Sequence, residues 1–245
     1  MFNKLTKRVT IEMSRRCNYA SMHKKCPVHH EKDPKYLKID VIMKTLEDIY
    51  MLGFNGIMAF HNYSEPMADP RLFLVLDKVR KLWAGERKLK SALILTNGYF
   101  LDQTMLDDLF QYGINEVNIS IYSAEEEARL AKLVAPEGLR LVFHHPKLDQ
   151  RLDAYDRNPE TKTNPCYCPL GEILIHSTGD VALCCRDWRG DNTFGNLYTS
   201  NIAEILNTGK MQEVYARLSK GDRFLPICKR CRCARQYSPD WKRKV

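Results

Sequence analysis

Residues 91–122 contain one complete strand–helix–strand pattern, and this stretch decides the fold class. It begins with the apolar run Ser91-Ala-Leu-Ile-Leu-Thr96, which predicts a strand that ends in Thr96-Asn97-Gly98. Residues 102–112 have the apolar spacing of a helix, and residues 116–122 alternate apolar and polar side chains as a strand does. A strand, a helix and a second strand in this order predict a parallel sheet with a right-handed crossover.

The same alternation continues on both sides of this stretch. Strands are predicted over residues 7–13, 56–61 and 140–145, and helices over residues 39–52, 70–83 and 124–134. About five strands precede residue 146, which is too few for a closed eight-unit barrel. The sequence therefore predicts an α/β fold for residues 1–146, a partial (βα) barrel with about five to six parallel strands.

The chain changes character after this region. Residues 147–165 are polar and rich in Pro and Asn, so they are predicted to form a linker. Residues 166–245 are predicted to form a small second domain. Glu172–His176 and Val181–Cys185 have the pattern of a β-hairpin around a Ser-Thr-Gly-Asp turn, and residues 201–218 have the period of one amphipathic helix.

The composition is typical of a globular protein. The chain has 245 residues, 44% of them hydrophobic, and no apolar run approaches the roughly 20 residues needed to span a bilayer. No secretion signal is visible at the N-terminus, so the expected location is the cytoplasm. The net charge is +8, without the interleaved aromatic and basic residues of RNA- or DNA-binding proteins, so neither a membrane nor nucleic acid is an expected partner.

The nine cysteines are the most informative part of the composition. Disulfides are disfavoured in a reducing compartment, and an odd number of clustered cysteines favours metal or cluster ligation. Thiolates are soft ligands, and four of them suit either a tetrahedral zinc ion or a [4Fe–4S] cluster. Seven of the nine lie in the C-terminal part: Cys166, Cys168, Cys184, Cys185, Cys228, Cys231 and Cys233.

Three polar or cysteine-bearing segments directly follow predicted strands. They are the loop with Cys17 and Cys26, the segment Asn62-Tyr-Ser-Glu-Pro66, and Thr96-Asn97-Gly98. Ligands of open parallel sheets bind at the carboxyl ends of the strands. We therefore expect the three segments to converge on one face and to form a ligand site.

The C-terminal cysteines resemble those of a known family. Cys166-Tyr-Cys-Pro169, Gly179-x4-Cys184, Gly195-Asn-Leu197 and Cys228-x2-Cys231 are similar to the auxiliary-cluster domain of radical S-adenosylmethionine enzymes. The long form of that domain, SPASM, holds two clusters, and the short form, twitch, holds one. Only Cys233 follows Cys231, so the short form matches better. The resemblance implies four cluster ligands, Cys166, Cys184, Cys228 and Cys231, with Cys168 as an alternative to Cys166.

The resemblance extends over most of residues 5–145. Tyr63-Ser-Glu-Pro66 is similar to the Gly-Gly-Glu-Pro segment with which the family contacts the methionyl amine of its cofactor. This implies cofactor binding by Tyr63, Ser64 and Glu65, whose carboxylate would accept hydrogen bonds from the ammonium. Further cofactor contacts are expected from the next strands, from Asn97, Asn118 and Ser120.

The cluster loop departs from the family pattern. The family uses Cys-x3-Cys-x2-Cys, whereas this loop has only Cys17 and Cys26. Cys26-Pro-Val-His29 has the spacing of the second and third ligands, so we hypothesise a Cys17-x8-Cys26-x2-His29 site. Imidazole can replace thiolate on iron, as in Rieske centres, and it raises the reduction potential of the cluster. His23 gives a rival arrangement, and His61 or Cys168 are further alternatives.

The resemblance implies two [4Fe–4S] clusters and S-adenosyl-L-methionine as cofactors. Such an enzyme is an oxidoreductase that generates a 5′-deoxyadenosyl radical for hydrogen abstraction, with an external electron donor such as flavodoxin or ferredoxin. The length and layout resemble the small family members that oxidise aminocyclitols, which favours a sugar-like or aminocyclitol-like substrate over a peptide. Arg151 is the predicted catalytic acid–base group, with His144 and His145 as alternatives.

Two other functions remain compatible with the residues. A degenerate, non-catalytic relative that acts as a partner or scaffold would explain the missing third cysteine of the N-terminal loop. A zinc-binding module would explain Cys228 to Cys233, but it would not explain the converging loops of the barrel.

Overall fold

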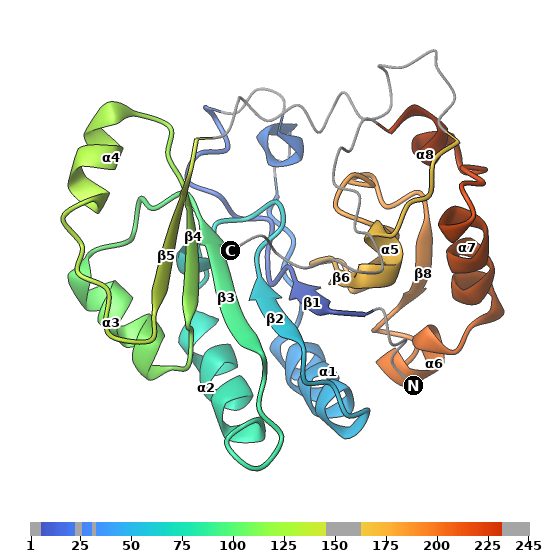
Figure 1. Ribbon diagram of the computed structural model, residues 1–245, viewed down its shortest axis with the longest axis horizontal. Helices are drawn as coiled ribbons and strands as arrows, with labels where there is room; N and C mark the ends of the chain where they lie inside the picture. Colours follow the sequence, from blue (N-terminus) through green and yellow to red (C-terminus); the bar gives the residue numbers. More distant parts are fainter. Residues whose placement is uncertain (1–5, 23–25, 31–32, 146–162, 232–245) are drawn as a thin grey trace.

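The strands of the computed structural model form one continuous sheet, shown in Figure 1, and the structure describes residues 6–22, 26–30, 33–145 and 163–231. The strand order is β5-β4-β3-β2-β1-β6-β7-β8. The bounds are β1 (Arg8–Ile11), β2 (Ile57–Phe60), β3 (Ser91–Thr96), β4 (Glu116–Ser120), β5 (Arg140–His144), β6 (Glu172–Ile175), β7 (Asp180–Ala182) and β8 (Thr193–Asn196).

Strands β1 to β6 are all parallel, which confirms the predicted α/β fold with five to six parallel strands. The sixth of these strands comes from the C-terminal part, because β6 pairs with β1 in the register Thr10↔Leu174. The hairpin partner β7 and the unpredicted strand β8 are antiparallel. The cysteine-rich part therefore extends the sheet of the barrel.

Four helices cover the outer side of the barrel strands in Figure 1. They are α1 (Ile39–Met51), α2 (Leu72–Leu82), α3 (Gln103–Gln111) and α4 (Ala124–Leu130). The predicted apolar stripe of α1 is confirmed, since Ile42, Leu46 and Ile49 are fully buried in the main core. Each such side chain contributes about 1.5–3 kcal/mol by leaving water.

The opposite face of the sheet carries buried polar groups on β1 beside a small apolar cluster of Ile57, Ala59 and Leu93. Val9 and Ile11 pack into the core beneath the helices, and strand side chains alternate, so Thr10 and Glu12 point to the other face. Both are completely buried, and Thr10 donates a hydrogen bond to Glu172 on β6. Polar groups that are buried on an inner sheet face in this way are positioned to meet a ligand.

The C-terminal helices differ from the prediction. The expected single helix over residues 201–218 is wrong, because the chain forms α6 (Ile202–Leu206) and α7 (Gly209–Ser219). The side chain of Thr208 accepts a hydrogen bond from the amide of Met211 and thereby starts the second helix. A capping residue inside an apolar period ends one helix and begins another. Two short helices complete this part, α5 (Cys168–Gly171) and α8 (Pro226–Arg230).

Two predicted elements are shorter than expected. Helix α4 ends at Leu130, because Leu133 already donates to Leu130 in a turn. Strand β7 ends at Ala182, so Cys184 lies in the following loop, where its carbonyl accepts from the amide of Asp187 at 3.0 Å. Within the described residues, no helix combines the length and the apolar character needed to cross a membrane.

Candidate cofactor and cluster site

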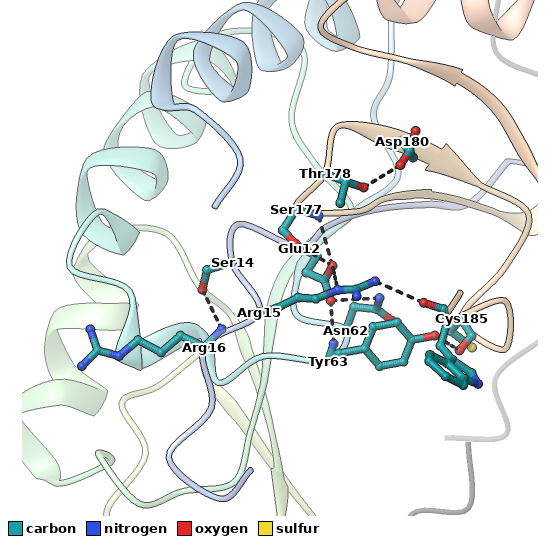
Figure 2. A network of polar contacts seen from close by, with 11 residues as sticks. Glu12, Ser14, Arg15, Arg16, Asn62, Tyr63, Ser177, Thr178, Asp180 and Cys185 are labelled. Carbon is teal, nitrogen blue, oxygen red and sulfur yellow. Dashed lines mark hydrogen bonds and ion pairs between the residues drawn. The ribbon is translucent and has the colours of Figure 1, made fainter. Parts of the chain in front are cut away.

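The carboxyl ends of β1, β2 and β6 are tied together by the carboxylate of Glu12 (Figure 2). Its Oε1 accepts from the side-chain amide of Asn62 at 3.2 Å and from the backbone amide of Tyr63 at 3.0 Å. Its Oε2 accepts from the backbone amide of Ser177 at 3.0 Å and from the Ser177 hydroxyl at 3.2 Å. The sequence interpretation missed Glu12, although a carboxylate inside an apolar, alternating strand was a visible signal.

Arg15 balances this buried charge. Its Nε lies 3.5 Å from Oε2 of Glu12, and its Nη2 donates to the carbonyl of Trp188 at 3.2 Å. The guanidinium also lies 5.6 Å from the ring centre of Tyr63, within the range of a cation–π contact. Further hydrogen bonds are the condition for keeping an ion pair buried, and Glu12 accepts four of them.

The three segments that follow β1, β2 and β3 converge as expected. The amide of Glu65 donates to the carbonyl of Arg16 at 2.9 Å. This bond joins residues 62–66, here called the cofactor segment because they were predicted to bind the cofactor, to the cysteine loop, which carries Cys17 and Cys26. The side-chain amide of Asn97 donates to Oδ1 of Asn18 at 2.8 Å, which joins the third segment to the same loop. This Asn97 amide nitrogen also lies 3.8 Å from the sulfur of Cys17.

Glu65 holds the second and third segments together. It caps the 3-10 turn η2 (Pro66–Ala68) by accepting from the amide of Met67 at 3.1 Å. It also accepts from the hydroxyl of Thr96 at 2.9 Å and from the amide of Asn97 at 2.7 Å. Burial raises the pKa of this carboxyl to about 7, against the lowering effect of these donors. The side chain of Glu65 thus fixes the cofactor segment to Thr96 and Asn97 at the end of β3.

The two N-terminal cysteines lie in one small apolar cluster. Buried Cys26 and half-buried Cys17 pack there with Val28, Tyr63 and Trp188. These residues come from the cysteine loop, the cofactor segment and the loop after β7, so distant parts of the chain meet at this point.

His29 lies in the 3-10 turn η1 (Pro27–His30) directly after Cys26. Its backbone amide donates to the carbonyl of Cys26 at 3.1 Å, and its Nδ1 is 2.8 Å from the carbonyl of Ala20. A proton on Nδ1 puts the lone pair on Nε2, as in metal-ligating histidines whose other nitrogen donates to a carbonyl. The rival candidate His23 lies outside the described residues.

The other predicted site residues lie on the inner face or at its edge. The side-chain amide of Asn118 donates to Glu116 at 2.7 Å, and its Oδ1 is 3.0 Å from Nε2 of His144. Ser120 ends β4 and is half-buried. His145 is exposed and paired with Glu127 at 3.2 Å. The predicted catalytic residue Arg151 lies outside the described residues.

The C-terminal thiols lie near one another at the edge of the core. Cys166, Cys184 and buried Cys228 pack against the same hydrophobic core. Burial raises the pKa of Cys184 well above its ordinary value, and the thiols of Cys185, Cys228 and Cys166 raise it further. Burial also raises the pKa of Cys228 to about 12, again with a contribution from Cys166.

The donor set of this region suits an iron–sulfur cluster chemically. Thiols in an apolar surrounding stay protonated on their own, and metal binding drives their deprotonation. Cys231 directly follows α8, and its amide is 3.4 Å from the carbonyl of Cys228. Among the residues that the structure describes, no three His, Cys, Asp or Glu side chains are gathered closely enough to hold a single metal ion. Cys233 lies outside these residues.

Residues 166–232 match the SPASM family model, an iron–sulfur cluster-binding domain. The whole chain is similar to the S-adenosyl-L-methionine-dependent 2-deoxy-scyllo-inosamine dehydrogenase of Niallia circulans, with 26% identity over 240 residues and 94% of each chain covered. This agrees with the layout expected from the sequence.

Solved structures show the same fold. The crystal structure of BtrN in complex with AdoMet and 2-DOIA matches with a TM-score of 0.82, 22% identity and 98% of each chain covered. Native anSMEcpe with bound AdoMet matches with a TM-score of 0.61 and 14% identity, over 95% of this chain and 92% of that one. Residues 166–232 therefore form an iron–sulfur cluster-binding domain of the SPASM class, and the whole chain is similar in sequence and in fold to S-adenosyl-L-methionine-dependent dehydrogenases.

Proposed function

We propose that this chain oxidises an alcohol carbon of a small polar substrate of the aminocyclitol or sugar class. One observation carries the proposal: the cysteine loop, the cofactor segment and the cluster domain meet at the carboxyl ends of the parallel strands. The contacts Glu65–Arg16 and Tyr63–Cys185 join these three parts. The substrate class is carried over from the inosamine dehydrogenase, which is similar over 94% of its length.

We assign two clusters of the [4Fe–4S] type to the proposed ligands by the chemistry of their donor atoms. In the first, imidazole completes a set of two thiolates, and in the second, four thiolates leave no iron open. The first set is Cys17, Cys26 and His29, and the second is Cys166, Cys184, Cys228 and Cys231.

The cofactor segment would bind the methionyl amine through the backbone carbonyls of Tyr63 and Ser64. The carboxylate of Glu65 holds this backbone in place, because it already accepts two hydrogen bonds from Thr96 and Asn97 and one from Met67 of its own turn. Support by groups whose own positions are fixed is what precise ligand binding requires. Asn97, Asn118 and Ser120 extend the proposed contacts along the next two strands.

When bound and reduced by an external donor such as flavodoxin or ferredoxin, the first cluster and S-adenosylmethionine supply a 5′-deoxyadenosyl radical that removes one hydrogen atom. Oxidation of an alcohol to a ketone then releases one proton and one further electron. The second cluster would accept the electron. Arg151 stays the predicted acid–base group, and His144 is the alternative whose neutral imidazole could accept the proton. The residues of the inner face orient one C–H bond and exclude water.

A peptide is the second candidate substrate. It is favoured by the structure of native anSMEcpe with bound AdoMet and the Kp18Cys peptide, which matches with a TM-score of 0.57. Incubation of the reconstituted enzyme with an aminocyclitol or with a cysteine-containing peptide, followed by mass spectrometry for a loss of two hydrogens, separates the two classes.

The decisive experiment is anaerobic purification and reconstitution, followed by measurement of iron, sulfide and zinc. Two clusters require about eight irons per chain. Addition of S-adenosylmethionine and a reductant should then yield 5′-deoxyadenosine. Zinc without sulfide would overturn the proposal in favour of a zinc module. Full clusters without 5′-deoxyadenosine would overturn it in favour of a non-catalytic relative.

A further inference from the structure

Tyr63 occupies the position where the resembling motif has its first glycine, and its side chain reaches out of the cofactor segment. The side chain is buried, and its hydroxyl donates to the carbonyl of Cys185 at 2.6 Å (Figure 2). The ring lies edge-on to His176, with 5.9 Å between the ring centres, and beneath the guanidinium of Arg15. A phenol at this position thus contacts the loop that carries Cys184 and Cys185.

The backbone of Tyr63 is fixed as firmly as its side chain. Its amide donates to Glu12, and the same carboxylate accepts from Ser177 at the start of the β6–β7 turn. Tyr63 is therefore linked at its amide, through Glu12, to the turn of the cluster domain's hairpin, and it is bound at its hydroxyl to the loop beyond the hairpin. Two contacts from one residue restrict rotation of the loop relative to the cofactor segment.

The loop of residues 184–192 also meets the N-terminal part through Trp188, which packs in the small apolar cluster with Cys26 and Val28. Its internal bonds include the buried carboxylate of Asp187, which accepts from the amides of Asp191 at 3.2 Å and Asn192 at 2.8 Å. Arg15 adds its bond to the carbonyl of Trp188. The loop is thus shaped by Asp187 and attached to the barrel by the hydrogen bonds of Tyr63 and Arg15 and by the packing of Trp188.

We propose that Tyr63 is a positioning residue that holds the loop of Cys184 and Cys185 against the cofactor-binding segment and so fixes the second cluster relative to the first. The attachment itself stands on contacts between the chain's own residues, whereas its effect on a cluster rests on the proposed function. The potential of a cluster depends on its hydrogen bonds and its exposure to solvent, so a loosened loop changes that potential.

Tyr63→Phe tests the attachment, because it removes one oxygen and keeps the ring contacts with Arg15 and His176. Tyr215→Phe is the matched control. Tyr215 is also buried in the cluster domain, with its ring edge-on to Phe194, but its hydroxyl has no hydrogen-bond partner among the described residues. Amide hydrogen exchange is measured on the full chain without added iron. Residues 184–192 should exchange about tenfold faster in Tyr63→Phe, as expected for the loss of one buried hydrogen bond, and at the wild-type rate in Tyr215→Phe.

The effect on the cluster is measured after reconstitution in a Cys17→Ala background, which is expected to leave only the second cluster. Tyr63→Phe should shift its electron paramagnetic resonance spectrum and midpoint potential, and Tyr215→Phe should shift neither. Unchanged exchange in Tyr63→Phe would overturn the attachment. Faster exchange with an unchanged spectrum and potential would overturn the positioning of the cluster. Faster exchange in a chain that takes up no iron would uphold the attachment and refute the proposed function instead.

Discussion

The amide of Ser177 donates to the carboxylate of Glu12 across a separation of 165 positions in the chain. This bond joins the end of the first barrel strand to the turn of the C-terminal hairpin. The pairing of β6 with β1 makes the same connection through the backbone. The cluster domain and the barrel therefore share a sheet and a buried charge, and a substitution at this junction should affect both.

Glu12→Ala should destabilise the chain by about 3–5 kcal/mol. The substitution leaves the charge of Arg15 buried without its carboxylate, and it leaves the amides of Tyr63 and Ser177 without their acceptor. Chemical denaturation of the chain without added iron measures this loss. Glu213→Ala is the control, since Glu213 is 63% exposed and its pairing with Arg217 is solvated. A loss below about 1 kcal/mol in Glu12→Ala would contradict the assigned role.

Glu65 should make stability depend on pH. Its pKa is about 7 in the folded chain, against an ordinary value of 4.5, so the folded state binds this proton more tightly than the unfolded state. Protonated Glu65 therefore contributes to the free energy of unfolding. This contribution is fully present below about pH 4.5 and is lost as the pH rises to 7, and the loss is about 3 kcal/mol at most.

Glu65→Gln removes this titration. The stability of the variant relative to the wild type should therefore improve between pH 5 and pH 8, when unfolding free energies are measured at both values. A relative stability that is constant over this range, or that worsens as the pH rises, would contradict the raised pKa of Glu65.

Gly179 should tolerate substitution less well than Gly53. Both have a positive φ, of +84° and +85°, so both substitutions by Ala incur the cost of a left-handed conformation, about 1–2 kcal/mol. A Cβ on Gly179 would also lie 2.7 Å from the ring of Tyr198, whereas nothing lies within 4 Å of a Cβ on Gly53. Unfolding free energies of Gly179→Ala and Gly53→Ala should therefore differ by at least 1 kcal/mol, as an order-of-magnitude estimate of the added clash. Equal losses would show that Tyr198 moves aside freely.

The parts of the fold that sequence patterns predicted are those with a local cause. The strand Ser91–Thr96 and the buried face of α1 follow from spacing along the chain, and the convergence of three loops follows from their common sheet edge. The break at Thr208 was missed because the apolar period continues through it. Glu12 was missed as a junction because its partners Asn62 and Ser177 are 50 and 165 positions away.

The candidate site divides in the same way into features that are local in the sequence and features that depend on distant contacts. The C-terminal cysteines could be proposed as ligands from the sequence, because Cys228 and Cys231 are close in sequence and the family motif covers the rest; their role as ligands stays a prediction. The contact of Tyr63 with Cys185 spans 122 positions, and no motif contains both residues. Contacts of this kind are decided by tertiary packing and are not visible in a single sequence.

Separate removal of the two proposed ligand sets should have different effects. Cys17→Ala should lower the iron content from about eight to about four and abolish 5′-deoxyadenosine formation, because the cofactor binds at the first cluster. Cys228→Ala should also lower iron to about four, but 5′-deoxyadenosine should still form while the ketone product does not. Cys185→Ala is the control and should keep all the iron. Equal loss of 5′-deoxyadenosine in Cys17→Ala and Cys228→Ala would show that the clusters do not act separately.

His29 is the proposed third ligand of the first cluster, and its replacement by Cys gives the sharpest test. Its Nδ1 is 2.8 Å from the carbonyl of Ala20, and a proton on Nδ1 would leave the lone pair of Nε2 for a metal. His29→Cys should keep about eight irons and lower the midpoint potential of the first cluster, since thiolate ligation gives lower potentials than imidazole. His29→Ala should lose about four irons, whereas His23→Ala should lose none. Loss of iron in His23→Ala together with full retention in His29→Ala would assign the ligand to His23 and refute the role of His29.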